Sequence, residues 1–462
     1  MTLRGMTWRS APGREKDVDA LRFELPYGRD TVAFELPGSF RAFEVAPAPR
    51  NAAADPRARV AEALDTLVGC ITWEDFADLK SVAVAVNDKT RPVPHDVLLP
   101  PLLEKLHAAG FAAEDITFLI ATGTHAPMEP RELPGILPAE VLERYRVESH
   151  DAYDTANLER VGTTSLGTPV WMNRHFLQAD LRIVVGNIEP HQFMGYSGGV
   201  KSAVIGLAGF ETVDYNHAFM SHEAARLGNL EGNPTRDDVE EMGAMVRVDL
   251  ALNAVLNRHK ELVDAVAGRP GEVMRAGVEI ARSIFEVDVP RPADAVIVSP
   301  GGHPKDINLY QAQKALAHAS LIAGDGAPIV LLAACPDGTG SEKYEEWVRE
   351  CSSNEDVLER FAREGFRVGP HKAFQIARDA AGRRVMLVST MDHERVRRLL
   401  LEPKGSAQEA VDAVVASLPS NAEVAVMPIA NATVPRIRSA APPGSSHEAS
   451  RGAQTPPEEG KR

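Results

Sequence analysis

Short runs of apolar residues alternate along the chain with longer segments in which apolar residues recur at helical spacing. The runs are rich in β-branched residues and lack polar alternation, which is typical of parallel strands buried on both faces. In the first half of the chain they cover residues 81–87, 115–123 and 181–188. Helical spacing is found over residues 95–109 and 140–145. This order predicts strands joined by helical crossovers, as in an α/β fold.

A second series with the same rhythm begins after Pro290 and Pro292, which indicate a domain boundary. The expected strands are residues 294–299, 328–334 and 384–389, and the expected helices are residues 309–322, 342–351 and 355–364. We therefore expect an α/β protein of two domains with Rossmann-like parallel sheets, with the active site in the interdomain cleft.

The domain boundaries follow from these patterns. We expect an N-terminal α/β domain over residues 1–290, in which residues 236–276 are helical, and a smaller C-terminal α/β domain over residues 291–405. A return segment over residues 406–432 is expected to pack on the N-terminal domain. Pro, Ser, Gly and charged residues dominate residues 433–462, which predicts a disordered tail.

Composition limits the class of partner and the compartment. The 462 residues carry a formal net charge of -15, which argues against a nucleic-acid surface because phosphate binding needs clustered Lys and Arg. The start lacks the apolar core of a secretory signal, and no apolar run reaches the ~18 residues of a membrane span. Cys70, Cys335 and Cys351 have no CxxC spacing, which suits a reducing compartment. We expect a cytoplasmic protein without nucleic-acid or membrane partners.

The segments that carry chemistry come directly after predicted strands. They are residues 87–92, 121–127, 187–201 and 300–306. Ligands of open α/β sheets bind outside the carboxyl ends of the strands. We therefore expect these four loops to converge on one cleft.

The first loop reads NDKTRP and contains Asp88 and Arg91. The guanidinium group of Arg91 can bind a carboxylate through two parallel hydrogen bonds. Asp88, three residues earlier, can orient that guanidinium group. A surface salt bridge in an ordinary loop is the alternative interpretation of this pair.

The second loop reads ATGTH and ends in His125. Small residues before a histidine let the backbone approach a ligand while the imidazole points into the site. Imidazole titrates near neutral pH, so His125 can take up and return a proton within one reaction cycle. An incidental loop histidine is the alternative.

The third loop, NIEPHQFMGYSGGVK, is the most informative of the four. Ser197, Gly198 and Gly199 can form a nest of backbone N–H groups, and Lys201 then begins a helix, an arrangement that binds phosphate. The spacing matches neither a Walker loop nor GxGxxG. His191 lies ten residues before Lys201, so both can face one cavity. A structural glycine turn remains the alternative.

A fourth segment, DYNH, ends in His217, which could ligate a metal through one ring nitrogen. No HExxH or HxxxH zinc pattern accompanies it. His222 is offset by five residues and does not share a helix face with His217. An ordinary residue on a helix surface is the alternative interpretation of His217.

The fifth segment, SPGGHPKDINLYQAQK, runs from a glycine-rich turn into a helix. Gln311 and Lys314 are three residues apart and share a helix face, which could present an amide and an ammonium group to an anionic ligand. His303 and Lys305 are expected to shape the loop or line the rim.

The stretches TGTH, EPHQFMGYSGGVK, DYNH and PKDINLYQAQK, in this order, resemble the nickel-pincer nucleotide-dependent lactate racemase family. The resemblance covers roughly residues 20–430 and implies an isomerase, a racemase or epimerase of 2-hydroxy acids. It implies reversible hydride transfer from C2 to a nickel-pincer pyridinium cofactor through a 2-keto acid. It also implies that the cofactor biosynthesis enzymes are needed for loading.

The resemblance implies specific cofactor contacts. Lys201 would hold pyridinium-3,5-bisthiocarboxylic acid mononucleotide nickel through a thioamide link, and His217 would supply the remaining ligand of the nickel ion. Ser197, Gly198 and Gly199 would bind the cofactor phosphate.

The resemblance also implies the contacts of the substrate. His125 and His191 would be the two acid/base residues on either side of it, and Arg91, oriented by Asp88, would hold its carboxylate. The pocket would be completed by Gln311 and Lys314. Trp347 and Phe374 are both candidates for an aromatic residue that shapes the pocket, with core packing as the alternative for each.

Two other functions remain open at this point. One is a non-redox metal-dependent lyase or hydrolase built on His125, His191 and His217. The other is a homologue that binds the cofactor or an organic anion without catalysis. The complete set of these histidines with Lys201 speaks against a decayed enzyme. Which 2-hydroxy acid would be the substrate is not determined by these motifs.

Overall fold

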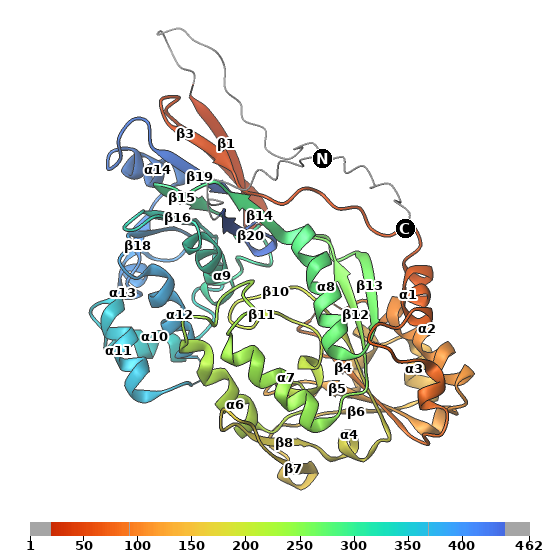
Figure 1. Ribbon diagram of the computed structural model, residues 1–462. Coiled ribbons are helices and arrows are strands. Elements are labelled where there is room, and N and C mark those ends of the chain that lie inside the picture. The colour runs from red at the N-terminus through yellow and green to blue at the C-terminus, as the bar shows by residue number, and fades with distance from the viewer. Residues whose placement is uncertain (1–19, 92, 368, 439–462) are drawn as a thin grey trace, which may run out of the picture.

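The computed structural model describes residues 20–91, 93–367 and 369–438. Its centre is formed by two six-stranded sheets, one in each half of the molecule (Figure 1). The first sheet has the order β13-β12-β9-β4-β5-β6, and all neighbouring strands are parallel except β12 and β13. Its strands are β4 (Val82–Asn87), β5 (Ile116–Ala121), β6 (Arg146–Ser149), β9 (Leu181–Asn187), β12 (Leu250–Leu256) and β13 (Leu262–Gly268).

The second sheet has the order β18-β17-β16-β15-β19-β3, with every neighbouring pair parallel. Its strands are β3 (Arg41–Glu44), β15 (Ala295–Val298), β16 (Ile329–Leu332), β17 (Val385–Val388), β18 (Glu402–Lys404) and β19 (Glu423–Met427). The α/β class with parallel sheets that the sequence predicts is confirmed.

Strand β4 shows why these runs lack polar alternation. Val82, Val84 and Val86 pack in one apolar cluster with helices α1 (Pro56–Asp65) and α2 (His95–Ala108). Ala83 and Ala85 point to the opposite face and join a different cluster. Because helices cover both faces, every position of the strand is buried, and small and branched apolar residues fill it. The predicted strands over residues 81–87, 115–123 and 181–188 correspond to β4, β5 and β9.

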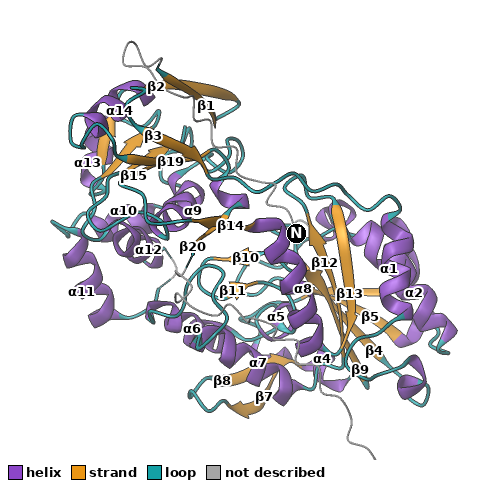
Figure 2. Ribbon diagram, turned by 45° about the horizontal axis from the view of Figure 1, so that its top comes forward, coloured by secondary structure: helices purple, strands orange, loops and turns teal. Residues whose placement is uncertain are grey.

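The remaining helices cover the two sheets and the space between them (Figure 2). The first half contains α3 (Ala139–Arg144), α4 (Arg174–Gln178), α5 (Lys201–Val204), α6 (Phe210–Ala218), α7 (Pro234–Val246) and α8 (Pro270–Phe285). The second half contains α9 (Leu309–Ser320), α10 (Glu342–Val348), α11 (Asn354–Glu364), α12 (His371–Ala380), α13 (His393–Arg398) and α14 (Ala407–Val415). No helix of the described ranges is long and apolar enough to cross a membrane.

The helical prediction over residues 236–276 is wrong in its middle. Helices α7 and α8 occupy its two ends, but the antiparallel pair β12 and β13 lies between them. The sequence of β12 is LALNAVL, and all seven of its residues are buried. A short apolar run buried on both faces has no period that distinguishes a strand from a helix.

The N-terminal strands and the segment 406–432 both pack in the second domain, which corrects two expected boundaries. The hairpin of β1 (Leu21–Tyr27) and β2 (Asp30–Leu36) packs on α14, and β3 pairs with β19. The segment 406–432, which we expected on the N-terminal domain, supplies α14 and β19 to the second domain instead. Strand pairing across a sheet joins residues far apart in sequence, and a local pattern does not record it.

The linker between the domains is itself paired. Strand β14 (Glu286–Val289) follows α8 and pairs in parallel with β20 (Val434–Ile437). Residues 434–437 therefore belong to the fold and not to the predicted tail; residues 439–462 of that prediction lie outside the described residues.

Two small hairpins complete the first domain. Strands β7 (Leu158–Thr163) and β8 (Pro169–Asn173) form one of them. Strands β10 (Pro190–His191) and β11 (Gly195–Tyr196) form the other, which lies between the two sheets in both views (Figures 1 and 2). The β10–β11 hairpin directly follows β9 and carries His191 to the region where the domains meet.

Candidate functional site

A cavity of about 1640 Å³ lies between the domains. In the first domain it is lined by the loops that follow β4, β5 and β9 and by α6; in the second it is lined by residues of α9, α10 and α12. Every site residue predicted from the sequence lines this cavity except Gly199. The carboxyl ends of three neighbouring parallel strands thus bring together segments that are far apart in the chain.

Asp88 and His125 form a pair at the first-domain wall. The Nδ1 atom of His125 lies 2.9 Å from Oδ2 of Asp88, whose other oxygen accepts hydrogen bonds from the hydroxyl group (2.6 Å) and N–H (3.2 Å) of Thr90. Burial raises the pKa of Asp88, but the hydrogen bonds from His125 and Thr90 outweigh it and hold that pKa below its ordinary value. The ionised carboxylate fixes the proton of a neutral His125 on Nδ1 and leaves Nε2 free to accept another.

This pairing corrects the expected role of Asp88. The sequence placed it behind Arg91, but its carboxylate is used by His125 and Thr90, and the contact recorded between Asp88 and Arg91 joins their backbones (3.1 Å). Arg91 is half-buried and lines the cavity. Its positive charge lowers the pKa of Lys201, second to burial, and that of His191, after burial and the charge of Lys201.

His191 occupies the end of β10 and lines the same cavity. Its Nδ1 atom accepts a hydrogen bond from the N–H of Met194 (3.4 Å), and its ring packs edge-on against Phe193 (4.7 Å between centroids). Burial, followed by the charges of Lys201 and Arg91, holds the pKa of His191 well below its ordinary value. The ring is therefore neutral at pH 7 and carries its proton on Nε2, the opposite nitrogen from that of His125.

Lys201 begins the short helix α5 and lines the cavity. Burial, then the charges of Arg91 and Arg236, lowers the pKa of Lys201 to about 7, although Glu189 and Asp88 act in the other direction. A large fraction of this amine is uncharged at neutral pH, and only the uncharged amine is nucleophilic.

The glycine loop before Lys201 does not present the full nest that its sequence predicts. The N–H of Ser197 donates to the carbonyl of Glu189 (2.8 Å), and the N–H of Gly199 donates to Oδ1 of Asn253 (2.7 Å). Two of the three expected phosphate donors are thus used inside the protein. The loop is also tightly packed: Gly198 has a φ of +91°, and a Cβ there would meet the side chain of Ile188.

His217 lies near the end of α6 and lines the cavity. Its ring packs edge-on against Phe193 and Phe366, with centroids 5.2 and 6.0 Å away. Burial, then the charges of Lys201 and Arg91, lowers its pKa to about 3. Its Nδ1 atom is buried without a hydrogen-bond partner of normal geometry among the described residues.

Gln311 and Lys314 share one face of α9 and both line the cavity, as their spacing predicts. The ammonium group of Lys314 donates to Oε1 of Gln311 (2.9 Å). Burial, then the charge of Arg91, lowers the pKa of Lys314 to about 8. Of the loop residues before this helix, Lys305 lines the cavity, whereas Nε2 of His303 lies 3.3 Å from the guanidinium group of Arg29.

Of the two candidate aromatic residues, one lines the cavity and the other lies in the core. Trp347 lines the cavity and carries the guanidinium group of Arg360 over its ring at 4.1 Å. Phe374 does not line the cavity and stacks on Phe361 in the core (4.4 Å).

Sequence reasoning missed a group of residues on the second-domain wall. Tyr310 directly precedes Gln311, and helix α12 contributes three further polar residues, which are His371, Lys372 and Gln375. It also missed Glu189, whose carboxylate binds Lys260 (2.9 Å) beside His191. The EPH stretch offered a signal for Glu189, but no local pattern distinguished the α12 residues from the rest of an amphipathic helix.

Comparisons with known proteins agree over both domains. The family model described as "Lactate racemase N-terminal domain" matches residues 27–228, and that described as "Lactate racemase C-terminal domain" matches residues 289–434. The lactate racemase of Thermoanaerobacterium thermosaccharolyticum is 29% identical over 418 residues, which are 88% of this chain and 97% of that protein. The lactate racemase of Lactiplantibacillus plantarum is 28% identical over 73% of this chain and 80% of its own length.

Solved structures extend the agreement to three dimensions. The structure of the T. thermosaccharolyticum lactate racemase apoprotein superposes with a TM-score of 0.83 and 29% identity, covering 90% of this chain and 100% of that one. A Thermotoga maritima protein, 18% identical, shares the fold with a TM-score of 0.60 over 85% of this chain and 100% of its own. With both family models matched in order and the same fold found in a relative that aligns over nearly its whole length, this chain belongs to the lactate racemase family.

Proposed function

We propose that this protein is an isomerase that inverts the C2 centre of a 2-hydroxy acid, with a nickel-pincer nucleotide as its cofactor. The observation that carries the proposal is the pair His125 and His191. Both line one cavity, and their protein contacts engage Nδ1 in opposite ways: as a donor in His125 and as an acceptor in His191.

This difference gives the two neutral rings opposite hydrogen-bonding roles toward a substrate oxygen. A neutral His125 that donates from Nδ1 to Asp88 has a free lone pair on Nε2 and can accept the hydroxyl proton of a substrate. A neutral His191 that accepts at Nδ1 holds its proton on Nε2 and can donate a hydrogen bond to a C2 oxygen. It can transfer a proton to that oxygen only after it has itself been protonated, so each turnover needs one neutral and one protonated histidine.

A racemase needs both, because the two enantiomers direct their hydroxyl groups to opposite sides of C2. Whichever histidine deprotonates the hydroxyl group of one enantiomer, the other must reprotonate the oxygen as the second enantiomer forms. As the substrate alternates between hydroxy acid and 2-keto acid, each histidine changes between the neutral and protonated form.

The carboxylate of the substrate is assigned to Arg91. Its guanidinium group is a planar, permanently charged donor of the first-domain wall, and two parallel N–H bonds would fix the orientation of C2. Lys314 and Gln311, hydrogen-bonded to each other on α9, would close the site from the second domain.

The residues of the cavity fit the proposed cofactor. Lys201, with its pKa lowered to about 7, is suited to a covalent acyl-type link through its amine. His217 is held neutral, as a metal ligand must be, and its imidazole lines the cavity. No three His, Cys, Asp or Glu side chains in the described ranges are grouped to hold a metal. A metal ion here would therefore need to bring most of its ligands with it, as a pincer complex does.

When bound, the nucleotide would supply a reversible acceptor for the hydride of C2. The protein's own residues would move the hydroxyl proton, hold the carboxylate and exclude water. Gly198 lines the cavity, and its N–H has no hydrogen-bond acceptor among the described residues, so it is the remaining backbone donor of the predicted phosphate nest.

The first experiment measures cofactor loading. The protein is produced together with the nickel-pincer biosynthesis enzymes, and its intact mass and metal content are determined beside Lys201→Ala. Lys343→Ala is the matched control, because Lys343 is an exposed lysine at the rim of the same cavity. We expect a cofactor-sized mass increment and about one nickel per chain in the wild type and the control, and neither in Lys201→Ala.

The second experiment measures inversion. The loaded protein is incubated with single enantiomers of lactate and of other 2-hydroxy acids, and the products are separated by chiral chromatography. Appearance of the opposite enantiomer supports the proposal. A chain that stays unmodified and nickel-free, while a lactate racemase loaded in parallel is active, contradicts it; zinc without nickel would favour the metal-dependent lyase or hydrolase instead.

A further inference from the structure

One buried lysine of the cavity wall has no part in the proposed reaction. Lys372 lies in the first turns of α12, lines the cavity and is only 5% exposed. A buried ammonium group costs free energy unless an anion or several hydrogen bonds compensate it. The contacts of Lys372 therefore indicate which kind of ligand group it can bind.

The protein contacts of Lys372 carry no negative charge. Its ammonium group donates to Oε1 of Gln375 (2.8 Å) and lies 4.5 Å from the centroid of the Tyr310 ring. Burial, then the charges of Lys314 and Arg378, holds the pKa of Lys372 well below its ordinary value. The one carboxylate that acts in the other direction is Asp379, which is already bound by the guanidinium group of Arg378 (2.8 Å). The described part of the protein thus offers Lys372 no unshared anion, and an anionic ligand in the cavity would favour its charged form.

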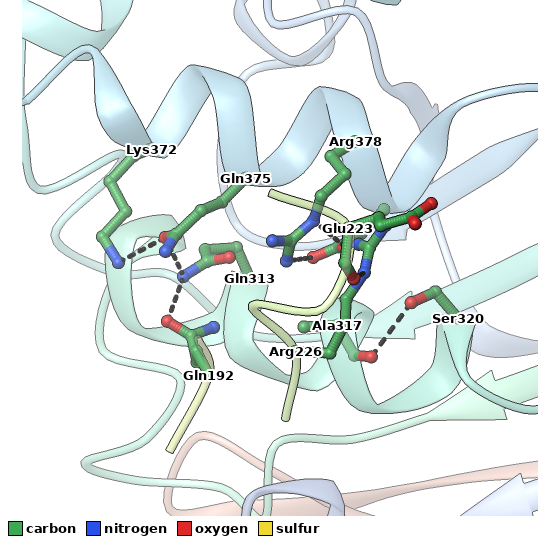
Figure 3. A network of polar contacts seen from close by, with 10 residues as sticks. Gln192, Glu223, Arg226, Gln313, Ala317, Ser320, Lys372, Gln375 and Arg378 are labelled. Carbon is green, nitrogen blue, oxygen red and sulfur yellow. Dashed lines mark hydrogen bonds and ion pairs between the residues drawn. The ribbon is translucent and has the colours of Figure 1, made fainter. Parts of the chain in front are cut away.

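The position of Lys372 is fixed by a chain of amides that crosses the domain interface (Figure 3). Oε1 of Gln375 also faces Nε2 of Gln313 on α9 (3.4 Å), and that same nitrogen faces Oε1 of Gln192 (3.5 Å). Gln192 is the residue after His191, at the tip of the β10–β11 hairpin. The lysine is consequently held in a defined place relative to one of the two proposed acid/base residues.

A series of ring contacts links the same wall to the proposed metal ligand. The His217 ring packs against Phe366 (6.0 Å), which packs against His371 (5.4 Å), which in turn packs against Tyr310 (6.0 Å). Tyr310 is the ring beneath the ammonium group of Lys372. These packed rings connect Lys372 to the proposed metal ligand along the lining of one cavity.

We propose that Lys372 binds a second carboxylate of the substrate, so that the substrate is a dicarboxylic 2-hydroxy acid. This inference rests on the proposed function: Arg91 on the first domain holds the carboxylate next to C2, and Lys372 on the second domain holds the far one. The new ion pair would compensate the burial of the ammonium group, and Tyr310 would remain stacked beneath it.

Binding to the protein without cofactor tests the proposal directly. Malate, lactate and inorganic phosphate are titrated by calorimetry into the wild type, Lys372→Met and the control Lys343→Met. Methionine keeps the length of the side chain without its charge. We expect malate to bind at least about tenfold more tightly than lactate, the effect of one charge-assisted contact. Lys372→Met should abolish that ratio, leave lactate affinity unchanged and not lower the melting temperature, because it removes a buried amine that has no anionic partner.

Three results would overturn the proposal. The first is equal affinity of the wild type for malate and lactate. The second is an equal loss of affinity for both acids in Lys372→Met. The third is tighter binding of phosphate than of malate that depends on Lys372. The last would assign Lys372 to the phosphate group of the nucleotide.

Turnover by the loaded protein separates this proposal from the proposed function. We expect Lys372→Met to lower kcat/KM for malate at least about tenfold while that for lactate changes little. If neither acid is inverted but the malate preference of the unloaded protein depends on Lys372, the racemase proposal fails and the second-carboxylate site stands. If lactate is inverted and malate is not, the racemase proposal stands and the site fails.

Discussion

The carboxylate of Asp88 and the imidazole of His125 are joined by a 2.9 Å contact between Oδ2 and Nδ1. The two side chains differ sharply in exposure: 5% for Asp88 and 58% for His125. A buried anion, fixed by Thr90 and by its place after β4, thus anchors a ring that otherwise extends into the cavity. The orientation of the ring and the choice of its protonated nitrogen both depend on this one partner.

Asp88→Asn should slow racemisation by about 100-fold or more, because general acid–base catalysis is worth about 10²–10⁴-fold and His125 would lose the acceptor that fixes its tautomer. The initial rates in both directions and the nitrogen chemical shifts of His125 measure the effect. Glu132→Gln is the control, since Glu132 pairs with Lys89 in the same region but does not line the cavity. An Asp88→Asn variant with wild-type rates would show that the pair is structural.

His191 should still be neutral, with its proton on Nε2, at pH 6.5, the ordinary pKa of an imidazole. Burial and the nearby charges of Lys201 and Arg91 hold its pKa well below that value, so no acid limb of the rate profile near pH 6.5 comes from the unliganded ring. Nuclear magnetic resonance of histidine-labelled protein without cofactor checks this, and His191→Gln assigns the signal. A titration midpoint near the ordinary pKa of 6.5 would contradict the prediction.

The strands were predictable where burial on both faces left an uninterrupted apolar run bounded by turn residues, as in β4, β5 and β9. They were not predictable where such a run followed a true helix, as β12 follows α7. The strand order of the second sheet could not be predicted from the sequence either, because β3 and β19 are nearly 400 residues apart yet pair directly. Neither residue pattern contains information on its partner.

For the candidate site, too, the sequence identified some residues and missed others. His125, His191, Lys201 and His217 stand in loops and helix ends with unusual local composition, and their segments drew attention for that reason. The partner of Asp88 was assigned wrongly because a spacing of three residues favours a local pair, whereas the actual partner is 37 residues away. Lys372 sits in an ordinary amphipathic helix, and its significance arises from burial, which depends on the packing of both domains.

Gly198→Ala should lower the free energy of unfolding by more than Gly232→Ala. At Gly198 the φ of +91° strains an L side chain, and the new Cβ would also overlap Ile188. Gly232 has a φ of +60° with open space around it, so strain of about 1–2 kcal/mol is its whole cost. We expect the overlap to add about 1–3 kcal/mol in Gly198→Ala, measured as the difference in urea unfolding. Equal losses would show that Ile188 moves aside freely.

The stability of the first domain should fall as the pH is lowered from 6.5, in part because of His95 on α2. Burial, opposed by a hydrogen bond to the carbonyl of Ile136 (3.0 Å), lowers its pKa from 6.5 to about 4. Above pH 6.5 both folded and unfolded forms are neutral, so this residue contributes no pH dependence there. Between pH 6.5 and pH 4 only the unfolded chain binds the proton, which reduces the free energy of unfolding by up to about 1.4 kcal/mol per pH unit.

His95→Asn, whose amide can donate to the same carbonyl, should therefore show a shallower loss of stability on acidification. Urea unfolding of both proteins at pH 7.5, 6.0 and 5.0 measures this, with pH 7.5 as the reference at which the histidine does not titrate; parallel losses in the two proteins would contradict a neutral, buried His95.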